Sequence, residues 1–221
     1  MDRHEYKIAL SFADALLLRT RLCAVMQRDS HAGADGTYRI RSFYFDDCRD
    51  TALAEKIAGV NTRQKFRLRC YNDDTSLIRL ERKCKRNGLC RKTAAALTPA
   101  QARALLDGQS DWMMQADDPF LRECAVLFRS LRPKTIVQYT REAFVFSAGN
   151  VRVTIDSDIR TGIYGGDFFS PDLPLVPSSE TPYLLEIKYD RYLPEIIRCL
   201  TQLDRAREGA FSKYTAARRF D

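Results

Sequence analysis

Residues 63–70 of the chain read RQKFRLRC, a stretch in which a basic residue occupies every odd position. Successive side chains of a β-strand point to opposite faces of the sheet, so this stretch predicts a strand with one basic face and one mainly apolar face. A similar alternation of charged and uncharged residues occurs in residues 79–85, 151–158 and 185–190. Together, these segments predict an antiparallel sheet with a charged surface.

The sign of the charge indicates what this surface binds. Four cations along one strand face repel each other unless anionic groups lie among them. An exposed, solvated face is the simpler interpretation of any single strand, but such a face usually mixes the two signs. Because the pattern recurs in several strands, we interpret the charged face as a site for a polyanion and expect helices to cover the apolar face.

The composition fits one folded domain. The 221 residues, 45% of them hydrophobic, suffice for a single compact domain that spans residues 1–221. The formal net charge of +7 indicates an anionic partner, such as nucleic acid, a membrane surface or a phosphorylated small molecule. Net charge alone does not choose among these partners.

Cysteine usage and hydropathy indicate the compartment. The seven cysteines include no C-x-x-C pair, which argues against a disulfide framework and a zinc site and favours reduced thiols. No apolar run approaches the length of a membrane span, and the first residues carry charge where a signal peptide would be apolar. We therefore expect a soluble cytoplasmic protein without a membrane segment of its own.

Periodicity and capping residues predict the order of the elements. Strands are expected at residues 6–10, 38–45, 63–72, 76–86, 134–147, 150–160 and 183–189. Helices are expected at residues 15–26, 50–58, 98–108, 120–131 and 194–207. The glycine- and proline-rich residues 165–182 predict a long irregular loop that could cover a site entrance.

Eight short motifs in one order make the polyanion hypothesis specific. They are residues 3–7 (RHEYK), 41–46 (RSFYFD), 65–69 (KFRLR), 81–83 (ERK), 139–144 (YTREAF), 152–156 (RVTID), 185–188 (LEIK) and 211–214 (FSKY). This series resembles the VTC domain, the polyphosphate polymerase module of the vacuolar transporter chaperone complex. That domain is part of the triphosphate tunnel metalloenzyme, or CYTH-like, superfamily. The resemblance covers nearly the whole chain.

The resemblance implies a fold and an activity. The implied fold is α+β, a closed antiparallel β-barrel tunnel of about eight strands with a charged lumen and flanking helices. The implied activity is transfer of the γ-phosphoryl group of ATP to a polyphosphate chain, assisted by Mn²⁺ or Mg²⁺. ATP and polyphosphate or triphosphate are the implied partners, and coupling to a membrane or a regulator would require a separate chain.

The resemblance also implies roles for individual residues. The basic residues expected to grip the phosphates are Lys7, Arg67, Arg69, Lys83, Arg141, Arg152 and Lys213. Further substrate-binding or supporting residues are Lys65, Lys85, Lys92, Lys188, Glu5 and Glu81. Glu186 is the implied metal ligand, although it could instead neutralise Lys188 or an arginine. Tyr44 and Asp46 could either line the tunnel or pin the end of a strand.

Alternative functions remain open at this point. The cyclase and thiamine triphosphatase branch of the superfamily carries a Glu-x-Glu-x-Lys strand, whereas this chain has Arg3, Glu5 and Lys7. The missing glutamate favours the polymerase-like branch, but a tunnel triphosphatase or a non-catalytic polyphosphate-binding module is still possible. Nucleic acid is disfavoured because the alternation would place stacking aromatics and phosphate-binding cations on different faces.

Overall fold

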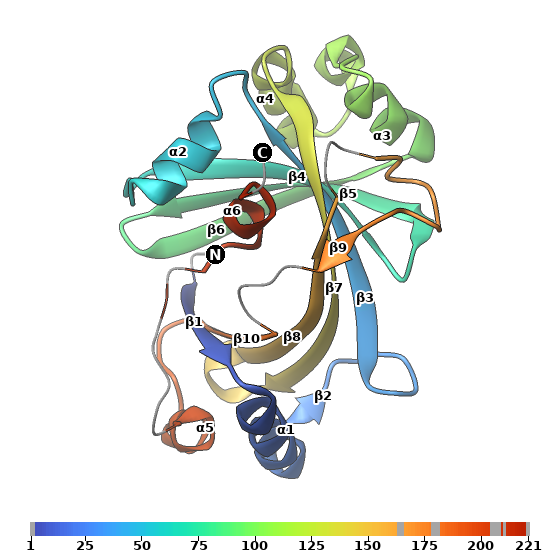
Figure 1. The fold of residues 1–221 in the computed structure, drawn as a ribbon. Helices are drawn as coiled ribbons and strands as arrows, with labels where there is room; N and C mark the ends of the chain where they lie inside the picture. The colour runs from blue at the N-terminus through green and yellow to red at the C-terminus, as the bar shows by residue number, and fades with distance from the viewer. Residues whose placement is uncertain (1–2, 163–165, 178–181, 204–208, 210, 220–221) are drawn as a thin grey trace.

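The antiparallel sheet is curled (Figure 1). The charged residues of its alternating strands line a cavity on the concave side. The computed structural model describes residues 3–162, 166–177, 182–203, 209 and 211–219. The strands in these residues are β1 (His4–Leu10), β2 (Gln27–Arg28), β3 (Thr37–Asp46), β4 (Arg63–Tyr71), β5 (Asp74–Arg86), β6 (Leu89–Leu97), β7 (Arg132–Phe146), β8 (Val151–Thr161), β9 (Val176–Pro177) and β10 (Tyr183–Tyr189). Eight of them follow the order β1-β10-β8-β7-β3-β4-β5-β6, while β2 pairs with β7 and β9 with β8.

The sheet is open, so the prediction of a closed barrel is wrong. Within the described residues, the only backbone pairing between the two edges of the sheet, β1 and β6, is an isolated bridge between Arg3 and Cys90. The backbone groups of these two residues exchange hydrogen bonds of 3.1 and 3.2 Å. Side-chain alternation specifies the two faces of a strand, but closure depends on the accumulated twist and stagger of all the strands, which alternation does not encode.

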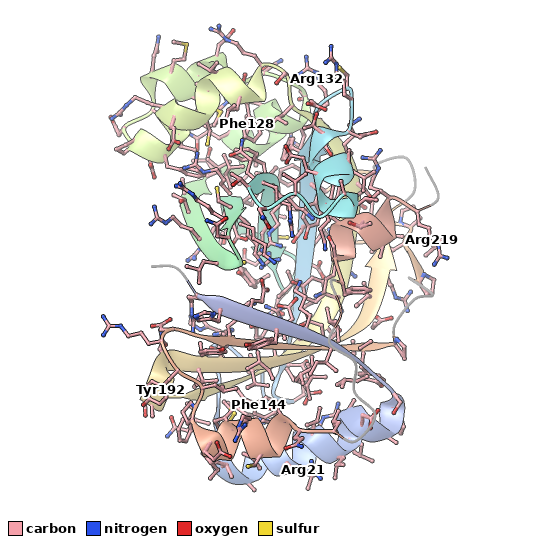
Figure 2. The ribbon with its side chains drawn as sticks, turned by 90° about the vertical axis from the view of Figure 1, so that its left-hand side faces the viewer. Arg21, Phe128, Arg132, Phe144, Tyr192 and Arg219 are labelled. Carbon is pink, nitrogen blue, oxygen red and sulfur yellow. The ribbon has the colours of Figure 1, made fainter. Side chains whose placement is uncertain are left out.

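Helices cover the apolar side of the sheet in two separate layers (Figure 2). The helices of these layers are α1 (Phe12–Val25), α3 (Pro99–Leu106), α4 (Pro119–Phe128) and α5 (Glu195–Thr201). One buried cluster joins Phe128 of α4 to the outer side chains of β4 and β5, and another joins α1 and α5 to Phe144 and the outer side chains of β8 and β10. No helix in the described residues is long and apolar enough to span a membrane.

Two short helices lie on the cavity side. They are α2 (Thr51–Ile57) and α6 (Lys213–Ala217). The Tyr214 ring of α6 stacks on Tyr44 with 5.0 Å between centroids, and its hydroxyl donates to Asp46 at 2.7 Å. Asp46 also accepts hydrogen bonds from the backbone amides of Ala52 and Leu53 at 3.0 and 3.1 Å. Asp46 therefore pins the end of β3 to both helices, one of the two roles expected for it.

Most predicted elements are present, and the differences have local causes. Asn72 and Asp73 join β4 to β5 with φ values of 52° and 58°, as a tight hairpin turn requires. The residues did not indicate β6, because alanines at 94–96 have a low strand propensity. The two-residue β9 lies inside the segment expected to be irregular. Residues 165 and 178–181 of that segment lie outside the described residues.

The last predicted helix is shorter than expected. α5 ends at Thr201, and Gln202 has an extended backbone with φ −73° and ψ 131°. Residues 204–208, which include the predicted end of the helix, lie outside the described residues. The difference concerns an element boundary, which periodicity locates poorly.

One charged residue departs from the predicted alternation. Asp158 has a φ of 47° beside a register shift between β7 and β8. Its side chain is 56% exposed and lies 2.9 Å from the Arg160 guanidinium. A bulge adds a residue to one strand and changes the face that later side chains occupy. Asp156 therefore lies on the concave face, whereas Asp158 points to solvent.

Gly149 provides a test of the turn between β7 and β8. Its φ is 72°, and a Cβ atom there would lie 2.5 Å from the backbone carbonyl oxygen of Tyr192. Gly108 has a φ of 79° with nothing within 4 Å of the Cβ position. We expect Gly108→Ala to lower the free energy of unfolding by ~1–2 kcal/mol, the cost of a left-handed backbone alone, and Gly149→Ala to lower it further. Urea denaturation measures both losses, and equal losses would contradict the clash.

Candidate functional site

A cavity of about 470 Å³ lies on the concave face of the sheet. Its charged lining, within the described residues, consists of Glu5, Lys7, Lys56, Arg63, Lys65, Arg67, Arg69, Lys83, Lys85, Arg141, Glu186, Lys188 and Lys213. Eleven of these side chains are cationic and two are carboxylates. Alternate residues of neighbouring strands share a face, so the sheet brings together charges that are far apart in the sequence.

Eleven of the fourteen site residues predicted from the sequence line this cavity. The other three are Glu81, Lys92 and Arg152. Glu81 is 1% exposed, and the Lys92 ammonium lies 2.5 Å from its carboxylate. Arg152 forms an ion pair with Asp29 and donates to the Tyr38 hydroxyl at 2.7 Å. A phosphate contact by Arg152 therefore stays a prediction.

Glu81 orients the two arginines of β4. Its Oε2 accepts a hydrogen bond from Arg67 at 2.9 Å and lies 3.8 Å from the Arg69 guanidinium. Arg67 also donates to the Tyr44 hydroxyl at 3.0 Å, and Arg69 donates to the Tyr139 hydroxyl at 3.1 Å. Burial opposes the ionisation of Glu81, but Arg69 and Arg67 lower its pKa below the usual value. The carboxylate is therefore ionised and fixes both guanidinium groups beside the cavity.

Glu186 is surrounded by four cations. Its carboxylate lies 2.8 Å from the Lys188 ammonium, 3.1 Å from those of Lys7 and Lys213, and 3.4 Å from the Arg141 guanidinium. Burial opposes the ionisation of Glu186, but the surrounding cations, Lys188 foremost, hold its pKa well below the usual value. This arrangement provides the charge-neutralising role expected as the alternative to metal binding.

Asp156 is a third buried carboxylate, and no role was predicted for it from the sequence. It is fully buried and accepts two hydrogen bonds from Arg141, at 2.6 and 2.7 Å. The Lys213 ammonium lies 2.5 Å away. Burial opposes the ionisation of Asp156, but Arg141 and Lys213 lower its pKa. Its place on the charged face could have been predicted, because it lies four residues after Arg152 and therefore on the same face of the strand.

The carboxylates at one end of the cavity fit a cation that arrives with a ligand. The described residues contain no group of three or more His, Cys, Asp or Glu side chains able to hold a metal ion. The Lys7 ammonium lies 3.1 Å from Glu186 and 3.9 Å from Glu5, so it bridges the two carboxylates. Mg²⁺ commonly takes one or two carboxylates and completes its shell with water and substrate phosphate oxygens. Glu186, supported by Glu5, fits that mode rather than a resident metal site.

Several cavity residues had no predicted role, and some carried a signal. Arg63 lies on the basic face predicted for residues 63–70, and Tyr139 shares the alternation of Arg141, so its face could have been predicted too. Lys56 comes from α2, where no strand pattern applies. Tyr44 lines the cavity, which is one of the two roles expected for it.

A family model agrees with this geometry. The VTC domain model matches residues 2–220. The chain belongs to the VTC domain family. The resemblance drawn from the eight motifs is thereby confirmed. No curated protein matches this VTC-domain chain in sequence.

Solved structures share the fold of this VTC-domain chain. An adenylyl cyclase candidate from Hippeastrum with a dominant triphosphatase activity is 15% identical, with a TM-score of 0.54, and the match covers 90% of this chain and 84% of that one. An adenylate cyclase candidate from Bacillus halodurans is 14% identical, with a TM-score of 0.51, and the match covers 85% and 82%. At these identities the similarity establishes the fold alone.

The buried carboxylate of Asp156 provides a test of the site's architecture. Removing one partner of a buried ion pair costs about 3–5 kcal/mol, so Asp156→Asn is expected to lower the free energy of unfolding at pH 7 by that amount. Asp158→Asn is the matched control, because its exposed pair with Arg160 contributes at most about 1 kcal/mol. Urea denaturation with circular dichroism measures both losses. A loss for Asp156→Asn as small as that of the control would contradict the assigned contacts.

The same contact predicts a pH dependence. Because the folded-state pKa of Asp156 is lowered, its stabilisation is present above the unfolded-state pKa, near 4, and is lost as the pH falls through the folded-state value. We therefore expect the stability difference between the wild type and Asp156→Asn to be constant from pH 7 to 5 and to shrink below about pH 4. Denaturation curves from pH 7 to 2.5 measure this trend, and a difference as large at pH 2.5 as at pH 7 would contradict it.

Proposed function

We propose that this protein is a polyphosphate polymerase that transfers the γ-phosphoryl group of ATP to a polyphosphate chain in the cationic cavity. The observation that carries the proposal is the excess of eleven cations over two carboxylates in the described lining of one cavity. A phosphate chain offers a row of anionic oxygens that matches such an excess. Membership of the VTC domain family supports the same ligand class.

Buried carboxylates hold the main cations in place before a ligand binds. Glu81 orients Arg67 and Arg69, and Asp156 orients Arg141. Phosphoryl transfer passes through a loose transition state with charge spread over the equatorial oxygens, so prepositioned donors supply most of the stabilisation. In the proposed reaction, an oxygen of the chain's terminal phosphate bonds to the γ-phosphorus, the bond between that phosphorus and the β–γ bridging oxygen breaks, and ADP leaves.

The arginines and lysines have different parts in this proposal. Planar guanidinium groups bind two phosphate oxygens at once, which suits Arg67, Arg69 and Arg141 to the phosphoryl group in transfer. The cavity lysines act as point charges along the rest of the chain. Arg152 lies opposite Lys188 on the neighbouring strand, and we propose that it contacts phosphates beyond the cavity.

A divalent cation completes the proposed site. Mn²⁺ or Mg²⁺ held by Glu186 and substrate oxygens would neutralise charge that develops on the transferred phosphoryl group. Glu186 itself positions Lys7, Lys188 and Lys213 through its carboxylate. We therefore propose two roles for Glu186: it binds the divalent cation, and it positions the three lysines.

Triphosphate hydrolysis is the second candidate. Within the described residues, a single isolated bridge, between Arg3 and Cys90, is the only backbone pairing between the two edges of the sheet, and we propose that water enters the cavity through this open side. If water attacked the γ-phosphorus instead of the chain terminus, inorganic phosphate would be released. The structural relative from Hippeastrum has a dominant triphosphatase activity.

A product assay distinguishes these functions. The purified protein is incubated with ATP and either Mn²⁺ or Mg²⁺, and the products are resolved as long-chain polyphosphate, free phosphate and ADP. We expect long chains and a matching amount of ADP, both dependent on the metal. Free phosphate without chains would establish the triphosphatase instead, and tight polyphosphate binding without any turnover would establish a binding module.

Glu186→Gln tests the proposed metal contribution with little change in shape. We expect metal-dependent turnover to fall by at least about 100-fold, since a charged transition-state contact is lost. Polyphosphate binding in metal-free buffer is expected to be retained or strengthened, because the variant removes a negative charge from the cavity. Glu195→Gln, at an exposed position on α5, is the control and should keep wild-type turnover. Full activity of Glu186→Gln would overturn the metal assignment.

A further inference from the structure

Lys65 differs in its contacts from Lys7 and Lys83, two other lysines that line the cavity. Its ammonium lies 2.9 Å from the Ser212 hydroxyl and 5.2 Å from the centroid of the Tyr214 ring. Neither contact carries a negative charge. By contrast, Lys7 and Lys83 each form an ion pair with Glu5.

Within the described residues, the charges that act most strongly on Lys65 from the surrounding elements are positive. Lys7 faces it from β1, and Lys83, its direct cross-strand partner, from β5. Lys56 faces it from α2 and Arg63 from its own strand. Each of these charges disfavours the ammonium form of Lys65.

The carboxylate on the neighbouring strand β3 does not offset this repulsion. Asp46 accepts hydrogen bonds from the Tyr214 hydroxyl and from the backbone amides that begin α2. No ion pair in the described residues joins Asp46 to Lys65. Ser212 and Tyr214, from the segment that carries α6, offer a hydroxyl and an aromatic ring in its place.

Burial adds to the repulsion. Removal from water disfavours the charged form of a lysine, and together with Lys7, Lys56 and Lys83 it lowers the pKa of Lys65 to about 7. Lys83 is also partly removed from water, but its ion pair with Glu5 opposes that effect. An added anion therefore changes the protonation of Lys65 more than that of Lys83.

We propose that Lys65 is largely neutral in the ligand-free protein above neutral pH and takes up one proton from solvent when a phosphate chain enters the cavity. The proposal rests on the proposed function for the identity of the ligand. The negative oxygens of the chain supply the counter-charge that no ion pair in the described residues provides to this lysine. Phosphate chain and proton then bind cooperatively, because each favours the other.

This coupling fixes the sign of a pH effect. At a pH low enough for Lys65 to be protonated before the chain binds, binding takes up no proton at this residue. Above that point, each pH unit weakens binding by up to about tenfold, as linkage to one proton requires. Affinity is therefore expected to rise as the pH falls from 9 to 7 and then to level off.

Calorimetry with long-chain polyphosphate in metal-free buffer tests the proposal. The internal phosphoryl groups of such chains stay ionised throughout this range, so proton uptake reports on the protein. Titrations at pH 8.5 in two buffers with different ionisation enthalpies give the number of protons taken up. We expect about one proton more at pH 8.5 than at pH 6 for each chain-binding site.

Two variants assign the proton to Lys65. Lys65→Arg keeps the positive charge but stays protonated throughout, so it should bind at pH 8.5 at least as tightly as the wild type and lose the additional proton. Lys85→Met is the matched control, since it removes another cavity lysine; it should bind more weakly but keep the additional proton. Uptake by Lys65→Arg equal to that of the wild type would overturn the proposal.

The outcomes separate this proposal from the proposed function. Wild-type binding without additional proton uptake at pH 8.5 would overturn the role of Lys65 and leave the phosphate site intact. Absence of polyphosphate binding by the wild type at every pH would overturn the proposed function and this coupling with it. Loss of the proton in both variants would show that uptake reflects total cavity charge rather than Lys65, and would also overturn the proposal.

Discussion

Repulsion among like charges is the constraint on which the rest of this structure depends. Eleven cationic side chains surround one cavity in the described residues, and they remain there because carboxylates behind and between them reduce the repulsion. Asp156 and Glu81 are almost fully buried and do this from the sheet itself. Because a buried charge without a partner is costly, each carboxylate also fixes the geometry of the cations that it contacts. The carboxylates do not neutralise all of the cations at the cavity surface, so a net positive charge remains there to attract a ligand.

The alternation of residues in the sequence predicted the faces of the strands and therefore most of the cavity lining. Side-chain period two is a local property, so Lys65, Arg67 and Arg69 could be placed on one face without any knowledge of their neighbours. What alternation could not predict was which groups meet across strands. The pairing of Asp156 with Arg141 and the diversion of Arg152 to Asp29 depend on register and on a loop position that no local pattern encodes.

Closure of the sheet was also beyond the sequence pattern, because it depends on the sum of many small strand rotations. The expected family fold was right in its class, its strand number and its charged concave face, and wrong in its closure. Lys56 was missed for a different reason: it enters the cavity from α2, whose residues follow no strand alternation. The cavity is thus partly a property of the sheet and partly of short helices that pack on it.

The strand order has a consequence for how the protein is made. β1 pairs with β10, from Leu10 against Tyr183 to His4 against Tyr189, so the strands between them in the sequence are synthesised before the backbone of β1 can pair with β10. Such non-local pairing slows folding and leaves a strand edge exposed during synthesis. Lys7 and Glu186 meet through this same pairing. The cationic centre therefore assembles only after β10, which carries the carboxylate that restrains it, has been synthesised.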